Sequence, residues 1–330
     1  MQKNNFIHLI QIFAPNRIKS LIMILGFWIF FLTSCTQDIT VDIPTPDPKI
    51  VVEGSIEQGV PPIISLTSTV PFYGDVNFNE LDNYYVHDAI VTVSDGINSV
   101  VLTEFCLEDL PDEIIPLVAE FLGVDLDTTG DYPVNICLYT VPDIFTGFPA
   151  FLGEIGKTYS LTIIHEGTTL SSSTAILPPV PPDSIYYKPH DDPANDTLVR
   201  LYIHLTDPPA QGNFYRYFTK RNTEGFYSGY SSVFDDNLIN GQSFDFTVDR
   251  GFNPTEDFDP DVYGYFWTGD TIILKWCSVD YSTYDFWRTL EFDSGTDGPF
   301  SSATIAQTNI NGGLGIWCGY GVSYDTLYIP

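Results

Sequence analysis

The chain has 330 residues, and its 13 basic and 43 acidic side chains give a formal net charge of −30 at pH 7. Such an acidic surface repels phosphate groups, so nucleic acids and anionic bilayer surfaces are excluded as electrostatic partners. Hydrophobic residues make up 44% of the chain and aromatic residues 15%, which supplies enough apolar surface for packed cores and excludes a disordered acidic tail.

The first predicted element is an export signal. Arg17 and Lys19 precede an apolar run over residues 21–32, which is followed by Thr-Ser and then by Cys35. A cationic start, a short apolar core and small residues before a cysteine are typical of a bacterial lipoprotein signal. We therefore predict a signal peptide over residues 1–34 and a lipid such as palmitate on Cys35, which would anchor the chain to a bilayer. An ordinary secretory signal or an N-terminal anchor helix is the alternative.

After the signal, residues 35–48 form a predicted tether, because their three prolines cannot join the centre of a sheet. Apolar and polar residues then alternate with the period of two that is typical of strands. This alternation predicts strands over residues 50–56, 64–67, 89–94, 99–103, 159–163 and 168–175. Short turn clusters separate these strands, so residues 49–180 are predicted to form an N-terminal β-sandwich-like domain.

Residues 104–141 interrupt the strand pattern and are predicted to be an insertion. Apolar side chains recur at helical spacing over residues 114–122, with Asp109 as the N-cap and Gly123 as the stop signal. Pro116 would kink this helix or begin a shorter one. The insertion is therefore predicted to be partly helical.

A proline-rich stretch, residues 177–183, predicts a domain boundary, because four prolines in seven residues interrupt any sheet. Residues 181–330 form the predicted C-terminal domain, with strands over residues 197–206, 213–220, 244–248, 271–279 and 314–320. The exception is residues 282–290, whose spacing predicts one short helix capped by Asp280 or Ser282. The predicted fold class is all-β, mainly antiparallel, with two β-sandwich-like domains.

Four cysteines remain if Cys35 carries a lipid, and an even number in an exported chain predicts disulfides. We expect Cys106 to pair with Cys137 and Cys277 to pair with Cys318, because each pair lies in one predicted domain. A tryptophan precedes both Cys277 and Cys318, which suggests matching strand positions. Four buried free thiols are the alternative. No CxxC or HxxxH spacing occurs, which disfavours a zinc site.

Acidic loops are the next candidate sites. Residues 256–261 place carboxylates at alternating positions, which is how a calcium loop begins, but Val262 and Thr268 replace the glycine and glutamate that an EF-hand needs. An EF-hand is therefore excluded. A non-standard calcium site is one interpretation, and a solvated acidic loop is the one that the overall acidity favours. Residues 191–192 and 235–236 are interpreted in the same way.

The sequence contains no recognisable catalytic motif. The histidines after the predicted signal are His87, His165, His190 and His204. None lies in a GxSxG-type or similar setting, and Gly313, Gly315 and Gly319 do not fit GxGxxG. These glycines are interpreted as permitting a bulge or close strand packing. We predict no catalytic residue, cofactor or resident metal, with a carboxylate pair for glycoside cleavage as the alternative.

Aromatic residues in or near predicted loops offer a different kind of site. They are Tyr84, Tyr85, Tyr227, Tyr230, Tyr263, Tyr265 and Trp267. Their rings could stack on sugar or peptide groups, so a binding surface is one interpretation. Burial in the cores is the other, and we favour it because most aromatic residues of β-sandwiches are core residues.

Several strings, in this order, resemble one family. They are KIVVEGSIE at residues 49–57, PP at 61–62, TVSDG at 92–96, PPDSI at 181–185, DPP at 207–209, GNFYR at 212–216, YDFWRTLE at 284–291 and NINGGLG at 309–315. Over almost the whole predicted mature chain, the sequence is similar to Bacteroidota outer-membrane lipoproteins called the domain-of-unknown-function 4249 family. The resemblance implies a cell-envelope partner, because this family is often encoded beside TonB-dependent receptors. It implies no catalytic residues.

These observations predict a lipid-anchored outer-membrane protein. We expect it to be a non-enzymatic accessory, or a ligand-binding partner, of a TonB-dependent receptor. A surface hydrolase of glycans or peptides and a structural or adhesive surface protein are the alternatives. Two converging carboxylates, or a histidine beside a serine, would indicate an enzyme, whereas an exposed patch of aromatic and polar side chains would indicate a binding module.

Overall fold

The structure is a computed structural model that describes residues 47–70, 84–115, 118, 135–253, 256–294 and 305–330. The predicted signal, Cys35 and nearly all of the predicted tether lie outside the described residues. Most of the helix predicted over residues 114–122 lies outside them as well. Within the described part of the chain, no helix is long and apolar enough to cross a membrane.

The alternating segments of the N-terminal half form strands. In β1, Val52 and Ile56 are buried whereas Glu53 is exposed, as a period of two requires. The elements of this half are β1 (Ile50–Glu57), β2 (Ile63–Ser68), β3 (Ile90–Ser94), β4 (Ser99–Val101), β5 (Thr103–Cys106), η2 (Leu107–Asp109), β6 (Cys137–Thr140), η3 (Ile144–Thr146), β7 (Thr158–His165) and β8 (Thr168–Ala175).

The C-terminal half combines strands with one α-helix in its described part. Its elements are β9 (Ser184–Pro189), η4 (Pro193–Asn195), β10 (Leu198–Thr206), β11 (Phe214–Arg221), β12 (Val233–Asp235), β13 (Ser243–Val248), β14 (Phe266–Trp267), β15 (Thr271–Val279), α4 (Tyr281–Ser294) and β16 (Leu314–Tyr328). Helix α4 confirms the helix predicted over residues 282–290. Asp280 is its cap, because the Asp280 Oδ1 accepts a hydrogen bond from the backbone N–H of Thr283 at 2.8 Å.

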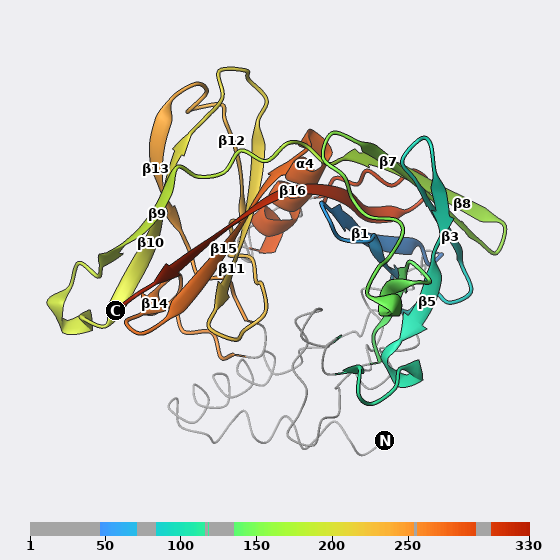
Figure 1. The fold of residues 1–330 in the computed structure, drawn as a ribbon, viewed down its shortest axis with the longest axis horizontal. Coiled ribbons are helices and arrows are strands. Elements are labelled where there is room, and N and C mark those ends of the chain that lie inside the picture. Colours follow the sequence, from blue (N-terminus) through green and yellow to red (C-terminus); the bar gives the residue numbers. More distant parts are fainter. Residues whose placement is uncertain (1–46, 71–83, 116–117, 119–134, 254–255, 295–304) are drawn as a thin grey trace, which may run out of the picture. The chain divides into compact units, whose positions relative to one another are not determined.

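The described strands form three sheets (Figure 1). The largest has the order β12-β11-β15-β16-β1-β2-β6-β5, and within it β1 and β16 are parallel, with Val51 opposite Leu314. The other named neighbours in this sheet are antiparallel. A second sheet contains β13, β10, β14 and β9, and a third has the order β4-β3-β7-β8. The predicted all-β, mainly antiparallel fold class is confirmed.

Glycines allow the chain to pack closely around β16. Gly315 has a φ of 98°, and a Cβ at this position would lie 1.9 Å from the carbonyl oxygen of Val52 on the neighbouring strand. A Cβ at Gly319 would lie 2.3 Å from the carbonyl oxygen of Ala175. No other residue type fits such contacts without moving the backbone. The interpretation of these glycines as close-packing positions is therefore correct.

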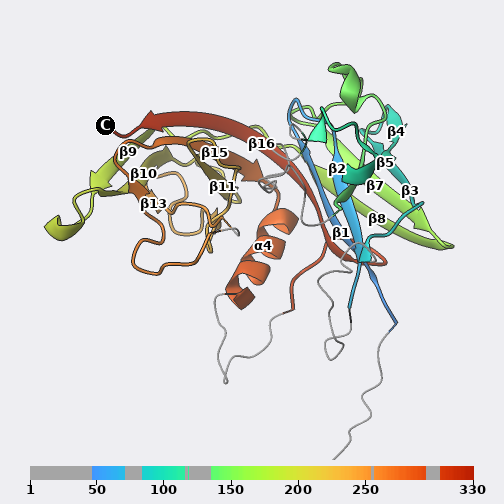
Figure 2. The same cartoon turned by 90° about the horizontal axis from the view of Figure 1, so that it is seen from below.

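The hydrophobic side chains of the described residues form three clusters. The first lies between β1, β2 and β6 of the large sheet and the β3-β7-β8 sheet, and it encloses Trp317, whose Nε1 donates to the carbonyl oxygen of Tyr159 at 3.1 Å. The second packs β10 and β14 against β11 and β15 around Trp276. The third contains Cys277 and Cys318 of the eight-stranded sheet and lies against α4. Figure 2 shows α4 beside β11 and β16 of that sheet.

Strand β16 contributes side chains to all three clusters. Trp317 belongs to the first, Leu327 packs against the second and Cys318 belongs to the third. Residues 47–330 accordingly form one compact unit. The predicted boundary at residues 177–183 falls between β8 and β9, and the division into two domains stays a prediction.

The two predicted disulfides have different outcomes. Cys106 and Cys137 face each other across β5 and β6, with their Cα atoms 4.0 Å apart, and they are bonded. Cys277 and Cys318 are free and buried, so their predicted pairing is wrong. Val322, not Cys318, lies opposite Cys277. The four residues from Val322 to Cys318 correspond to about 13 Å of extended strand, whereas a disulfide needs Cα atoms about 4 to 7 Å apart.

Candidate functional site

A groove with a volume of about 620 Å³ lies where the start of α4 meets the start of β11 and the end of β12. This volume is within the range of roughly 300 to 1,000 Å³ that is typical of small-ligand sites. The groove is lined by Gln211, Gly212, Phe214, Asp235, Asp236, Asn237, Tyr281, Tyr284 and Arg288. Aromatic, amide and charged side chains therefore share one concave surface.

Three aromatic rings form one wall of the groove. Tyr281 and Tyr284 lie three residues apart in the first turn of α4, so both face β11. The ring of Phe214 stacks on Tyr284, with centroids 4.9 Å apart, and meets Tyr281 edge-on at 5.4 Å. Tyr284 is 9% exposed and Tyr281 is 59% exposed. The wall therefore exposes the ring of Tyr281 to solvent, and this ring contacts the packed rings of Phe214 and Tyr284.

Polar side chains form the rest of the groove. The Asp235 Oδ2 accepts hydrogen bonds from the Tyr284 hydroxyl at 2.9 Å and from the Asn237 Nδ2 at 2.7 Å. Burial, together with the bond to Asp235, raises the pKa of Tyr284 to about 12, so this hydroxyl stays protonated and donates at neutral pH. Arg288 is half exposed, and its bond to Asp285 raises its pKa. A carboxylate, an amide and a guanidinium group therefore line the groove.

Asp236 shapes the groove from within. The sequence predicts a solvated carboxylate here, which is wrong because Asp236 is 1% exposed. Its Oδ2 accepts hydrogen bonds from the backbone N–H groups of Gly212 at 2.7 Å and Asn213 at 3.0 Å. Two backbone donors compensate a buried carboxylate, and they fix the loop before β11. By contrast, Asp192 is exposed and caps η4 by accepting from the backbone N–H of Ala194 at 2.9 Å.

A second cavity, of about 130 Å³, lies beside β14. Arg221 and Arg250 face the ring of Trp267, with guanidinium carbons 5.0 and 5.3 Å from the ring centroid. Both arginines form ion pairs with Glu256. The cavity is much smaller than a typical small-ligand site. It has room for a group the size of one side chain.

The acidic loop over residues 256–261, for which the sequence favours a solvated loop over a calcium site, belongs to this second region. Glu256 is neutralised by the two arginines, and the Asp259 Oδ1 accepts a hydrogen bond from the backbone N–H of Asp261 at 3.0 Å. These contacts are typical of an exposed acidic turn. Within the described residues, the carboxylates of this loop do not converge with two other potential metal ligands.

The aromatic residues singled out in the sequence lie in separate places. Tyr230 and Tyr263 pack together beside the second cavity, with ring centroids 5.0 Å apart. Tyr265 packs instead against His190 and Arg200. Tyr85 forms a bridge with Thr67 of β2, in the other half of the chain. These aromatic residues therefore do not form one continuous stacking surface. None of the seven is fully buried, so the favoured interpretation of burial in the cores is wrong as well.

The four histidines that the structure describes have polar partners, but none of these partners is a serine hydroxyl. The His204 Nδ1 lies 3.0 Å from the Asp245 Oδ1 on an exposed sheet face, and the His190 Nδ1 accepts from the backbone N–H of Asp192. His165 lies 4.0 Å from Glu166. Among the described residues, no histidine nitrogen is hydrogen-bonded to a serine hydroxyl, which is the contact that a serine hydrolase needs.

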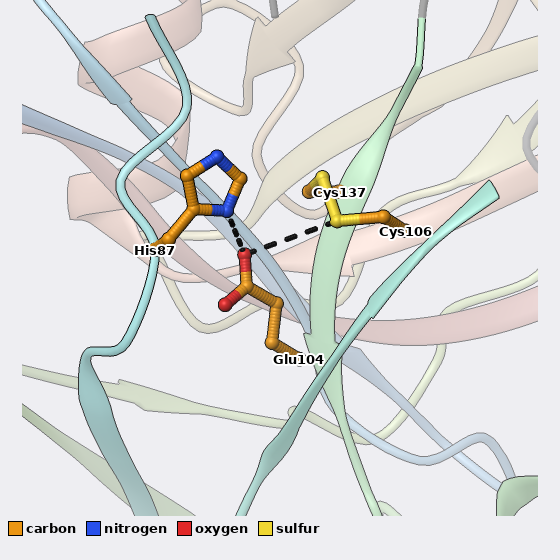
Figure 3. Close-up of side chains that lie close together, drawn as sticks. All are labelled: His87, Glu104, Cys106 and Cys137. Carbon is orange, nitrogen blue, oxygen red and sulfur yellow. Dashed lines mark hydrogen bonds and ion pairs between the residues drawn. A yellow bond between two sulfur atoms is a disulfide. The ribbon is translucent and has the colours of Figure 1, made fainter. Parts of the chain in front are cut away.

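The fourth histidine belongs to a separate polar cluster, shown in Figure 3. The His87 Nδ1 lies 2.5 Å from the Glu104 Oε1, and this oxygen lies 4.0 Å from the Sγ of Cys106. Cys106 is bonded to Cys137 on the neighbouring strand. His87 and Glu104 are partly exposed, whereas both cysteines are buried. Imidazole, carboxylate and sulfur groups therefore meet at one point near the surface.

Comparison with known sequences adds the family. Residues 36–325 match a family described as a domain of unknown function, DUF4249. The chain belongs to this family. A search of curated proteins gives no match.

For this DUF4249 chain, sequence reasoning missed both the groove and the cluster of Figure 3. Phe214, Asp235 and Tyr281 come from three elements, and no spacing connects them. His87 likewise precedes β3, whereas Glu104 lies on β5. The one signal in the sequence was the predicted pairing of Cys106 with Cys137. Glu104 lies two residues before Cys106, so this pairing places its carboxylate near the disulfide. These DUF4249 sites therefore depend on tertiary contacts.

Proposed function

We propose that this chain is a lipid-anchored outer-membrane protein that binds a ligand in the α4 groove and acts as a non-enzymatic accessory of a TonB-dependent receptor. The observation that carries the proposal is the groove itself, where the exposed ring of Tyr281 lies beside Asp235, Asn237 and Arg288. A site with one available ring and several planar polar groups is suited to binding rather than to bond cleavage.

A sugar-containing molecule is the ligand class that this chemistry fits best. One face of a pyranose ring carries C–H groups that pack on an aromatic ring, and its hydroxyls need donors and acceptors at the edge. Tyr281 supplies the ring, Asp235 accepts hydrogen bonds and Arg288 donates them. The groove is open enough for part of a longer chain to extend beyond it. We therefore propose an oligosaccharide as the ligand.

Two features support the envelope part of the proposal. The lipoprotein-type signal before Cys35 would supply the anchor. The chain belongs to the DUF4249 family, and the resemblance to this family is what implies a TonB-dependent receptor as partner. The strongly acidic chain would need such an anchor, because its charge does not favour binding to anionic bilayers.

The partnership is tested by co-purification. The tagged full chain is expressed in its own host, extracted from membranes in mild detergent and purified, and the co-purifying proteins are identified by mass spectrometry. A β-barrel receptor should be enriched over an unrelated tagged lipoprotein. Recovery of the chain alone would contradict the accessory role.

The groove is tested with an array of defined oligosaccharides, followed by calorimetry on the best binder. Tyr281→Ala should weaken binding about fivefold or more, because a nucleobase stacked on one aromatic ring contributes about 1 to 3 kcal/mol and we expect the C–H face of a sugar to contribute a similar amount. Tyr328→Ala is the matched control, since Tyr328 is similarly exposed, at 62%, and does not line the groove. Equal affinities of the two variants would contradict the groove. Binding of peptides in preference to every oligosaccharide would contradict the ligand class.

The anchor is tested by metabolic labelling with palmitate. Cys35→Ala should lose the label and accumulate as an unprocessed or mislocalised precursor, because the modified cysteine is also the processing site. Cys277→Ala is the control and should keep the label, since Cys277 is buried in the sheet. Equal labelling of Cys35→Ala and the parent would overturn the lipoprotein assignment.

A further inference from the structure

The cluster of Figure 3 has the ligand types of a zinc site. His87, Glu104, Cys106 and Cys137 each offer one ligand atom, and these four atoms all lie within 4.8 Å of one another. Neutral imidazole, carboxylate and thiolate are the groups that bind Zn²⁺ in proteins, four of them at a time. Within the described residues, no other group of three or more such side chains converges in this way.

Neighbouring groups orient the carboxylate toward the cluster. The Glu104 Oε2 accepts a hydrogen bond from the backbone N–H of Asp88 at 3.2 Å and lies 3.1 Å from the hydroxyl of Tyr139. The same hydroxyl is held in place by the carbonyl oxygen of Val86 at 2.8 Å and by the backbone N–H of Ala89 at 3.2 Å. These contacts leave the Glu104 Oε1 facing His87 and Cys106. Partners of this kind fix ligand geometry around metal ions.

We propose that reduction of the Cys106–Cys137 disulfide creates a Zn²⁺ site whose ligands are the two cysteine sulfurs, the His87 Nδ1 and the Glu104 Oε1. The reductant is a dithiol. It transfers two electrons and two protons to the protein S–S bond and becomes a disulfide itself. Zn²⁺ then displaces the two thiol protons and forms two Zn–S bonds. The disulfide and the zinc complex are thus alternative states of one cysteine pair.

The position of the cluster permits exchange between these states. The His87 side chain is 50% exposed and the Glu104 side chain 20% exposed, so solvent and metal reach the cluster from that side. The two cysteines are themselves buried, so the reductant must reach their sulfur atoms past these two side chains. The other two cysteines are not competitors. Burial raises the pKa of Cys277 to about 12 and that of Cys318 to about 11, which keeps both thiols protonated at neutral pH.

The test compares reduced and oxidised forms of the full chain in detergent. The reduced form is prepared with dithiothreitol and desalted without oxygen, and each form is titrated with Zn²⁺ against a chromophoric chelator. The reduced form should bind one Zn²⁺ per chain, whereas the oxidised form should bind none tightly. His87→Ala should weaken binding by about tenfold or more, because loss of even an outer-shell partner costs about 10- to 100-fold.

Two controls separate this site from other sources of binding. His190→Ala and the Cys277→Ala/Cys318→Ala double variant should both bind Zn²⁺ like the reduced parent. Co²⁺ added to the reduced parent should give thiolate charge-transfer absorption and strong tetrahedral ligand-field bands. This measurement needs no variant and is independent of folding defects caused by substitution.

Three results would overturn the proposal. They are equal Zn²⁺ affinity of reduced and oxidised chains, unchanged affinity in His87→Ala, and a Co²⁺ complex without thiolate absorption. None of these readouts depends on oligosaccharide or receptor binding, so failure here leaves the proposed function unaffected.

Discussion

The two cysteine pairs lie in the same eight-stranded sheet but in opposite surroundings. Cys106 and Cys137 face each other on β5 and β6 at one edge of the sheet, beside the partly exposed His87 and Glu104. Cys277 and Cys318 lie on the interior strands β15 and β16, beneath α4. They are almost completely buried and are offset along the strands.

This difference shows that strand register and polar neighbours decide what a cysteine does. A directly opposed pair near polar groups can form a disulfide or share a metal ion. An offset pair in an apolar layer can do neither, and its sulfurs act as small core groups.

The largest expected effect is on the buried side, from Arg216→Met. Arg216 lies opposite Cys277 and is 3% exposed, and its guanidinium stacks on Trp287 at 3.5 Å and donates to the Tyr320 hydroxyl at 2.9 Å. Its removal leaves the carboxylate of Glu291 without this buried cation. We expect the free energy of unfolding to fall by about 3 to 5 kcal/mol, as measured by urea denaturation.

The control for this prediction is Arg216→Met combined with Glu291→Gln. The second substitution removes the carboxylate charge that has lost its nearby cation, so the double variant should recover part of the lost stability. If the double variant were no more stable than Arg216→Met, the loss would come from packing around Trp287 instead.

On the edge side, we expect Cys106→Ser/Cys137→Ser to lose about 3 to 4 kcal/mol of unfolding free energy. The disulfide joins residues 31 positions apart, and a loop of this length restricts the unfolded chain by about that amount. Urea denaturation with and without dithiothreitol measures the effect. The reductant should destabilise the parent and the Cys277→Ala/Cys318→Ala variant equally, and it should leave the serine variant unchanged. A parent insensitive to reductant would contradict the disulfide.

The pH dependence of stability should distinguish the pairs next. Burial raises the pKa of Cys277 to about 12 and that of Cys318 to about 11, from an ordinary value of 9.0. The contribution of these thiols is complete below pH 9. As the pH rises further, the unfolded chain loses protons that the folded chain keeps, so stability falls by about 1.4 kcal/mol per pH unit for each thiol.

Urea denaturation between pH 8 and about 10.5 measures this decline. Cys277→Ala/Cys318→Ala should show a shallower decline than the parent, because the variant lacks the two titrating thiols. Buried tyrosines contribute equally to the decline in both proteins. Bonded Cys106 and Cys137 do not titrate, so their substitution should leave the slope unchanged. The same slope in the parent and in the alanine variant would contradict a raised pKa at the buried pair.

The smallest expected effect concerns His204, which contacts Asp245 on an exposed face and belongs to neither cysteine pair. His204→Ala should change the free energy of unfolding by less than about 0.5 kcal/mol, because exposed ion pairs contribute little. The substitution also tests the hydrolase alternative, with chromogenic glycosides and peptides as substrates. Cleavage by the parent that disappears in His204→Ala would contradict the proposed non-enzymatic function.

Local sequence patterns account for most of the secondary structure. Alternation in β10 places Leu201, Ile203 and Leu205 in the core, and the spacing of aromatic residues predicts α4. The parallel pairing of β1 with β16 could not be predicted, because it joins Val51 to Leu314 and leaves no local trace. The fold class was therefore accessible from sequence, whereas the order of strands was not.

The candidate sites were less accessible for the same reason. Repeated Trp-Cys strings suggested that Cys277 and Cys318 share a register, but Val322 is the residue opposite Cys277. Asp236 looked like a surface charge because only the tertiary structure supplies its backbone donors, Gly212 and Asn213. Sequence periodicity determines which face a side chain occupies, but it does not determine the partner across the sheet.

The pairing of β1 with β16 also bears on how the chain is made. Synthesis proceeds from the N-terminus, so β1 leaves the ribosome long before its parallel partner exists. Until then, one edge of β1 has unpaired N–H and C=O groups that other strands can capture. Nascent or truncated chains that end before Leu314 would lack Trp317 from the first core and Cys318 from the third. Such chains should depend on chaperones until translation has passed β16.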